Sequence, residues 1–247
     1  MTEKELLLKR DGKKIYGKLL IPEKKQEKYP LVLLAHGFSS NYESLFCYAK
    51  EITKSNFITY TFDFIGGSNK TKSDGKTTET SVMTEVKDLK EIIKYFKKQD
   101  YIDKNNIFLL GASQGGLVTA LTSSQMPNDI KAQILLYPGF SIVDEVHNTF
   151  KKKENIKEFS LWGVEIGKIY SKDIWDLDIY SEVTKYIKPT LIIHGTNDNI
   201  VNINYSRKAH EKYLNNKFIE IEGAYHGFKE KRHFVKAIKE IIEFIKK

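Results

Sequence analysis

The stretch Ile107-Phe-Leu-Leu-Gly-Ala-Ser-Gln-Gly-Gly-Leu117 combines an apolar run, a glycine-rich turn and the start of an apolar helix. Its centre, Gly111–Gly115, is a Gly-x-Ser-x-Gly motif. Between a buried strand and a helix, this motif predicts a nucleophile elbow, a strained turn that exposes the hydroxyl of Ser113. The glycines are needed because a β-carbon there would collide with the neighbouring strand or helix. A purely structural turn is the alternative that the motif alone leaves open.

Around this stretch, strands alternate with helices along the 247-residue chain, which predicts one α/β domain over residues 1–247. Apolar or alternating runs predict eight strands, two of them within residues 4–21 and the others at 31–35, 57–62, 107–110, 132–137, 189–195 and 218–221. Helices are expected at 44–55, 81–99, 205–214 and 231–246. Ser81 or Thr80 caps the second of these, with Glu85 in its first turn. No repeat and no linker divides the chain.

Residues 139–180 interrupt this alternation, because no strand and no strong helical period appears there. The segment contains Phe140, Trp162 and Trp175. About 40 residues is long for a connection, and such insertions usually have a function. We expect a cap over the site whose aromatic side chains line a substrate pocket. A small satellite core that only covers the sheet is the alternative, and exposed aromatic surface would equally serve a homodimer contact.

Three residues that each follow a predicted strand have the side chains of a catalytic triad. Ser113, Asp198 and His226 occur in the chain order Ser…Asp…His. A serine hydroxyl needs an imidazole to take its proton, and a carboxylate must hold that imidazole in the right tautomer. Asp63 and Glu222 are the other candidates for the acid. Asp198 has the alternative role of capping the next helix.

The loop after the strand at 31–35 supplies the second feature of such a site. It reads His36-Gly37-Phe38, and its glycine lets the backbone turn its N–H groups inward. The N–H groups of Phe38 and Gln114 are therefore the predicted oxyanion hole. We expect His36 to be a structural histidine that orients the loop, and His194 to be structural as well.

Composition and charge exclude several other classes of function. The chain has 40 lysine and arginine residues against 32 acidic ones, but they are spread out, which predicts a solvated surface and no nucleic-acid partner. Cys47 is the only cysteine, and no group of side chains has the spacing of metal ligands. No apolar window approaches a membrane span. We expect a soluble cytoplasmic protein that acts on a small molecule without a metal or a cofactor.

Four segments carry a resemblance to a known family: Leu33-Leu-Ala-His-Gly-Phe38, Gly111-Ala-Ser-Gln-Gly-Gly116, His194-Gly-Thr-Asn-Asp198 and Gly223-Ala-Tyr-His-Gly-Phe228. Over essentially its whole length the sequence resembles the α/β-hydrolases, and within them the bacterial cinnamoyl (feruloyl) esterases. The resemblance implies a central, mostly parallel eight-stranded sheet flanked by helices. It also implies hydrolysis of carboxylic esters by a serine triad, and an inserted cap after the sixth strand that shapes the acyl pocket.

The expected function is cleavage of small or medium acyl or aryl esters, cinnamoyl esters among them, through an acyl-enzyme on Ser113. A thioesterase or a small-peptide hydrolase with the same triad stays open, because the sequence does not show the leaving group. A non-catalytic binding protein is the alternative from another class. The presence of all three triad residues argues against it, since binding alone does not require them.

Overall fold

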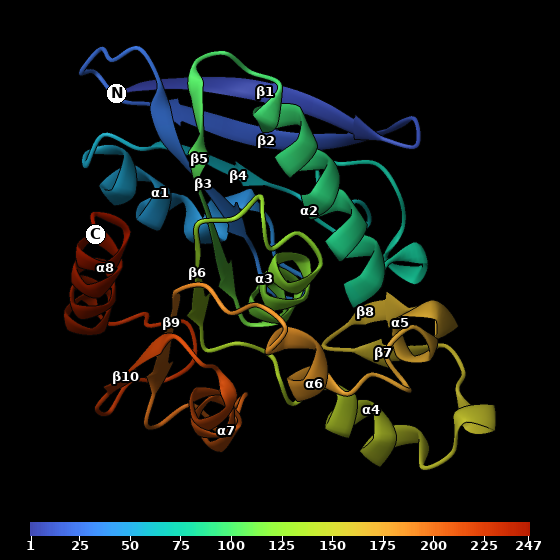
Figure 1. The fold of residues 1–247 in the computed structure, drawn as a ribbon. Helices are drawn as coiled ribbons and strands as arrows, with labels where there is room; N and C mark the ends of the chain where they lie inside the picture. The colour runs from blue at the N-terminus through green and yellow to red at the C-terminus, as the bar shows by residue number, and fades with distance from the viewer.

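The predicted strands assemble into one central sheet with the strand order β1-β2-β4-β3-β5-β6-β9-β10 (Figure 1). The computed structural model describes residues 1–247. β2 pairs antiparallel with β1 and β4, and every other neighbouring pair is parallel, so the expected mostly parallel eight-stranded sheet is confirmed. The strands of this sheet are β1 (Thr2–Arg10), β2 (Lys13–Ile21), β3 (Tyr29–Ala35), β4 (Ile58–Phe62), β5 (Ile102–Ala112), β6 (Ala132–Leu136), β9 (Thr190–Gly195) and β10 (Asn216–Ile221).

The first two strands form a hairpin whose turn chemistry is visible in the sequence. Asp11 and Gly12 both have positive φ angles, 50° and 79°. A two-residue turn with this geometry matches the right-handed twist of the strands, and aspartate and glycine are the residues that adopt it most readily.

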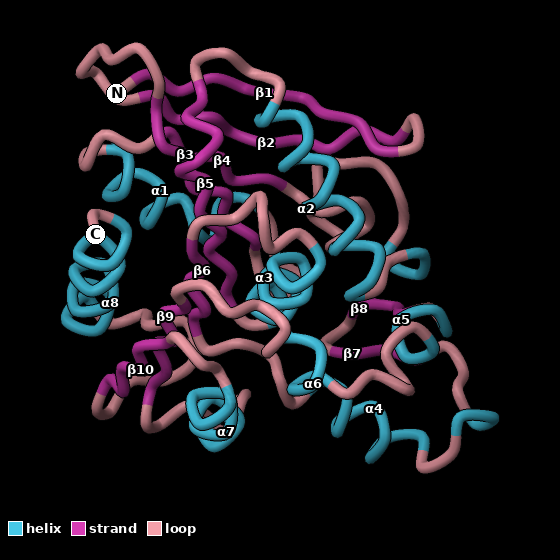
Figure 2. Tube along the Cα trace, in the orientation of Figure 1, coloured by secondary structure: helices cyan, strands magenta, loops and turns pink.

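Helices cover both faces of the sheet, which explains why strands such as β4 and β6 are buried along their whole length. Figure 2 shows the strands running through the middle of the molecule between the two helical layers. One face is covered by α1 (Phe46–Thr53) and α8 (Lys231–Ile245), the other by α2 (Val82–Lys97), α3 (Gln114–Gln125) and α7 (Asn204–Lys212). No helix of the structure combines the length and the apolar character that crossing a lipid bilayer requires.

The insertion between β6 and β9 is more regular than the sequence predicts. It contains α4 (Ile142–Phe150), the antiparallel pair β7 (Phe159–Leu161) and β8 (Val164–Ile166), α5 (Lys168–Lys172) and the start of α6 (Ile179–Val183). The expectation that 139–180 holds no strand and no strong helical period is therefore wrong, because β7 and β8 are strands and the buried residues of α4 follow a helical period. Most of these elements span only three to five residues, too few for a hydrophobic period to show. In Figure 1 the insertion lies beside α3 and the start of α2.

Candidate active site

Ser113 lies where β5 ends and α3 begins, with its backbone in the left-handed region at φ 55°. The Ser113 N–H donates to the carbonyl of Leu136 at 2.9 Å, and the Gly139 N–H donates to the carbonyl of Ser113 at 2.7 Å. These bonds hold a conformation that is costly for a residue with a side chain. A β-carbon at Gly111 would lie 2.1 Å from the carbonyl oxygen of Gly115, so the packing of strand against helix requires glycine there.

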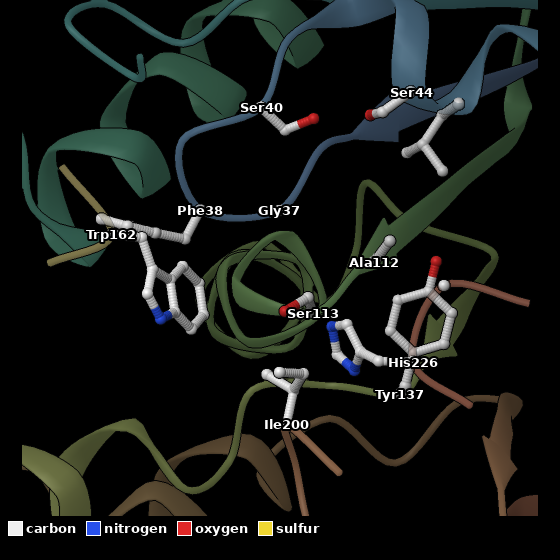
Figure 3. Close-up of a pocket in the computed structure, with 12 residues that line it drawn as sticks. Gly37, Phe38, Ser40, Ser44, Ala112, Ser113, Tyr137, Trp162, Ile200 and His226 are labelled. Carbon is white, nitrogen blue, oxygen red and sulfur yellow. The ribbon is translucent and has the colours of Figure 1, made fainter. Parts of the chain in front are cut away.

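Asp198 and His226 lie at the same edge of the sheet as Ser113. They follow β9 and β10, and parallel strands end at one edge, where α/β proteins place their ligands. Figure 3 shows the imidazole of His226 pointing toward Ser113, and both residues line one cavity. The structure thus brings together the three residues that the sequence singles out.

The Asp198 carboxylate is buried, with its side chain 1% exposed, and each of its oxygens is bonded. Oδ2 accepts the Nδ1–H of His226 at 2.7 Å, and Oδ1 accepts the N–H groups of Ile200 and Val201 at 2.9 Å. Burial acts to raise the pKa of Asp198, but the hydrogen bonds from His194, His226 and Val201 outweigh it and hold that pKa well below its usual range. The ionised carboxylate therefore leaves Nε2 of His226 available to Ser113.

A second histidine, His194, lies behind this carboxylate. Its Nε2–H donates to the carbonyl of Val201 at 2.9 Å and lies 3.2 Å from Oδ2 of Asp198, while Nδ1 is 2.7 Å from the Ser206 hydroxyl. The sequence predicts a structural histidine here, and the structure adds a contact with the acid. Because the ring is fully buried, it supports Asp198 without reaching the cavity.

The other acidic and histidine candidates make different contacts. Asp63 is fully buried and accepts two backbone N–H groups from the loops after β3 and β4, each at 2.7 Å. Glu222 is exposed. Nε2 of His36 accepts the N–H of Phe64 at 3.2 Å, which fixes the loop after β4. None of the three makes a hydrogen bond with His226.

Two cavities meet at Ser113. The larger, of about 350 Å³, lies between the loop after β3 and His226. The smaller, of about 40 Å³, lies under the insertion, beside α3. Trp162 and Ile200 line both cavities, whereas His226 borders only the larger one. The hydroxyl and the imidazole thus face a space that admits a small molecule.

The three aromatic residues predicted to form the pocket have different positions. Trp162 is 67% exposed and packs edge-on against Phe38 with ring centroids 5.7 Å apart, so it forms part of the wall. Phe140 is buried in the core beneath the insertion. Trp175 packs against His147 with ring centroids 4.4 Å apart. Neither Phe140 nor Trp175 lines the cavities beside Ser113.

Two residues of the site, Tyr137 and Ile200, are not predicted from the sequence. Tyr137 packs against the His226 ring with centroids 4.6 Å apart and has an unusual positive φ of 37°. Ile200 follows Asp198 by two positions and lines both cavities. Only their places after predicted strands could have indicated them. Tyr137 comes directly after β6, at the edge where the strands β5, β6, β9 and β10 all end.

Two backbone N–H groups lie close to Ser113 and lack partners. A β-carbon at Gly37 would lie 3.1 Å from Cβ of Ser113, so the loop after β3 approaches the elbow closely. The N–H of the next residue, Phe38, makes no hydrogen bond in the protein. Gln114 is the first residue of α3, where a backbone N–H has no intrahelical acceptor and the helix dipole favours negative charge.

Comparison with protein families gives one clear match. The model of the Prolyl oligopeptidase family matches residues 49–247. The matched part includes Ser113, Asp198 and His226, and it excludes β1 to β3.

Known proteins of three kinds are similar to the chain. The solved structure of Est1E from Butyrivibrio proteoclasticus with ferulic acid bound is 28% identical, with a TM-score of 0.89, and the match covers 98% of this chain and 100% of that one. A protein of Mycoplasma genitalium named "Putative esterase/lipase 2" is 27% identical over 83% of this chain and 85% of its own. An uncharacterized 31.7 kDa protein from the traX-finO intergenic region of Escherichia coli is 32% identical over 119 residues, 47% of this chain. The match spans only 41% of that relative.

Proposed function

The chain belongs to the prolyl oligopeptidase family, and we propose that it is a serine hydrolase that cleaves carboxylic esters with Ser113 as the nucleophile. Its fold is the α/β-hydrolase fold. The observation that carries the proposal is the pairing of Asp198 with His226 at 2.7 Å, beside a cavity that His226 shares with Ser113. Similarity to Est1E, solved with ferulic acid, and to a protein named as an esterase or lipase supports an ester as the substrate.

In this mechanism Nε2 of His226 takes the proton of the Ser113 hydroxyl while Oγ attacks the ester carbonyl carbon. The oxyanion that forms accepts hydrogen bonds from the N–H groups of Phe38 and Gln114, each of which contributes about 3 kcal/mol in comparable sites. Cleavage of the C–O bond releases the alcohol, which receives the proton from His226. Water, activated by the same imidazole, then hydrolyses the acyl-enzyme and restores Ser113.

The two cavities divide the substrate between them. His226 must protonate the leaving oxygen and borders only the larger cavity, so that cavity takes the alcohol. The smaller cavity under the insertion then takes the acyl group. In this arrangement residues 139–180 act as a cap. The small volume there favours short acyl groups, and Trp162, which lines both cavities, limits longer ones.

Peptide hydrolysis on the same triad is the second candidate, because the family takes its name from a peptidase. A bound peptide brings several backbone polar groups, and each needs a hydrogen-bond partner when it is desolvated. Half of the residues that line the larger cavity are hydrophobic, among them Phe38, Leu45 and Ile200. This lining favours an ester over a peptide.

The experiment compares leaving groups on one acyl group. Purified protein is assayed with p-nitrophenyl butyrate, butyryl thiocholine and butyryl p-nitroanilide, and with methyl ferulate as an aryl substrate. We expect the p-nitrophenyl ester to be cleaved fastest, and a fluorophosphonate probe to label wild type but not Ser113→Ala. Faster cleavage of the anilide than of the ester would favour the peptidase. Labelling that persists in Ser113→Ala would overturn the nucleophile.

A further inference from the structure

The side chain of Gln114 is the centre of a buried hydrogen-bond chain. Its Nε2–H donates to Oε2 of Glu85 at 2.8 Å, and its Oε1 accepts the hydroxyl of Tyr170 at 2.7 Å. The three side chains come from α3, α2 and α5, and each is 4% exposed or less. The nitrogen of the Gln114 amide is thus bonded to α2, and the oxygen of the same amide is bonded to the insertion.

This Glu85–Gln114–Tyr170 chain touches both elements that carry the N–H groups of the oxyanion hole. Gln114 supplies one of them from its own backbone. The ring of Tyr170 packs edge-on against the ring of Phe38, which supplies the other, with centroids 6.0 Å apart. Donors of this kind are effective only when they are preorganised toward the position of the oxyanion.

The position of Tyr170 depends in turn on how the insertion docks on the start of α2. The Ser81 hydroxyl donates to Oδ2 of Asp173 at 2.6 Å, and the Thr77 hydroxyl donates to the carbonyl of Glu165 at 2.6 Å. A β-carbon at Gly167 would lie 1.9 Å from the carbonyl oxygen of Thr78, so backbone meets backbone there. α5 is therefore tied to the core on both sides of Tyr170.

We propose that Glu85 and Tyr170 are positioning residues of the hydrolysis: through the Gln114 side chain, the docked insertion holds the two oxyanion donors in the orientation that the reaction needs. This inference rests on the proposed function, because it assumes that the N–H groups of Phe38 and Gln114 stabilise an oxyanion. Glu85 is too deeply buried to reach the substrate. The hydroxyl of Tyr170 is occupied by Gln114, although its ring contributes to the wall of the smaller cavity.

Glu85 acts here as a neutral group. Burial raises the pKa of Glu85 to about 8; the hydrogen bond from Gln114 opposes this rise and the charge of Asp88 adds to it. The groups that face it are Asp88, which pairs with Arg10 of β1, the Gln114 amide and the Tyr170 hydroxyl. Glutamine has the same shape and no charge, so Glu85→Gln keeps the acceptor that Gln114 needs, whereas Glu85→Ala removes it.

The test measures kcat and KM for p-nitrophenyl butyrate in wild type, Glu85→Ala, Glu85→Gln and Tyr170→Phe. Loss of one oxyanion donor costs about 10² to 10³-fold in kcat, so partial misorientation is expected to cost about 10-fold in Tyr170→Phe and more in Glu85→Ala. KM should stay within about twofold, because these residues act on the transition state. Glu85→Gln should restore most of the kcat.

A matched control lies at the opposite end of the sheet. There the buried Nε2–H of Gln133 donates to the hydroxyl of Tyr213 at 3.2 Å. Tyr213→Phe removes a buried hydroxyl from a buried glutamine, as Tyr170→Phe does, but far from Ser113. It should lower the melting temperature and leave kcat at the wild-type value.

The outcomes separate the two proposals. Wild-type kcat in Tyr170→Phe, equal losses in Tyr170→Phe and Tyr213→Phe, or a loss confined to KM would each overturn the positioning inference while the esterase stands. A wild type that neither cleaves esters nor reacts with fluorophosphonate at Ser113 would defeat the proposed function itself. If Glu85→Ala does not fold, the kcat values of Tyr170→Phe and Glu85→Gln still test the positioning inference.

Discussion

The sheet and the insertion contribute to the site in different ways. Ser113, Asp198 and His226 all lie just past strand ends, on a layer whose central strands, such as β6 and β9, are buried on both faces. The insertion contributes Trp162 to the cavity wall and Tyr170 to the Gln114 amide. The rigid layer thus carries the proposed reacting groups, and the short elements of the insertion shape and constrain the space around them. Substitutions on the sheet should therefore act on the chemical step. In the insertion, substitutions in the cavity wall should act on substrate choice, whereas those at Tyr170 should act on the chemical step through Gln114.

The largest expected effect is on the sheet side, at Ser113. Ser113→Ala removes the proposed nucleophile, and kcat should fall on the order of 10⁵-fold or more, with the melting temperature nearly unchanged because a strained residue is replaced by another small one. Initial rates with p-nitrophenyl butyrate measure the loss. Residual activity within about tenfold of wild type would contradict the assignment and would remove the contrast between sheet and insertion.

Asp198→Asn also changes the sheet side of the site, and its expected loss of kcat is the second largest. The amide cannot hold the His226 tautomer in the same way, and we expect kcat to fall about 10⁴-fold with little change in KM. Asp63→Asn is the matched control, because Asp63 is equally buried but bonds only the loops after β3 and β4. A greater loss of kcat in the Asp63 variant would make Asp63 the better candidate for the acid.

Trp162→Ala addresses the insertion. Removing the indole takes away a wall that the two cavities share, so the ratio of kcat/KM for p-nitrophenyl octanoate to that for the acetate should rise about tenfold. The ratio for methyl ferulate to the acetate should rise as well. Trp175→Ala is the control, since Trp175 packs on His147 outside the cavities. The same change of ratio in both variants would argue against Trp162 as the wall.

The last expected effect is on stability and not on rate, at the junction of the two regions. The pKa of Glu85 in the folded protein, about 8, lies above its value of 4.5 in a solvated chain. The stability associated with its protonated form is therefore fully present below about pH 4.5 and is lost as the pH rises toward 8. Glu85→Gln has no such proton, so its melting temperature should improve relative to wild type between pH 5 and pH 8. A difference that is constant across this range would contradict the burial of an uncharged Glu85.

Much of the sheet side could be predicted because its signals are local. The Gly-x-Ser-x-Gly turn implies close packing that only glycine permits, and a β-carbon at Gly111 or Gly115 would indeed lie 2.1 Å or 2.3 Å from a backbone carbonyl oxygen. Ser113, Asp198 and His226 each follow an apolar strand, and parallel strands end at one edge whatever the details of packing. Their positions just past these strands therefore already implied that the three residues lie at one edge of the sheet.

Most of the insertion resisted prediction because its elements span only three to five residues, too few for periodicity. α4 is the exception, since its buried Ile142, Val143, Val146 and Phe150 follow a helical period. Phe140, Trp162 and Trp175 are alike in the sequence as aromatic residues of one segment, yet one is buried in the core, one lines the cavities and one packs on a neighbouring histidine. Only tertiary packing separates these positions, because no local pattern distinguishes an aromatic ring that packs in the core from one that stays exposed at a cavity wall.

The sequence by itself determined the α/β architecture, the elbow at Ser113 and the positions of Asp198 and His226 past their strands, since each follows from short-range sterics or from strand order. Tertiary structure alone decided that Glu85, which in the sequence is an acidic residue in the first turn of a helix, is buried against Gln114. It also decided that Tyr170 reaches the same amide from 56 residues further along the chain. Contacts at such a separation depend on how whole layers dock, and no local pattern records that.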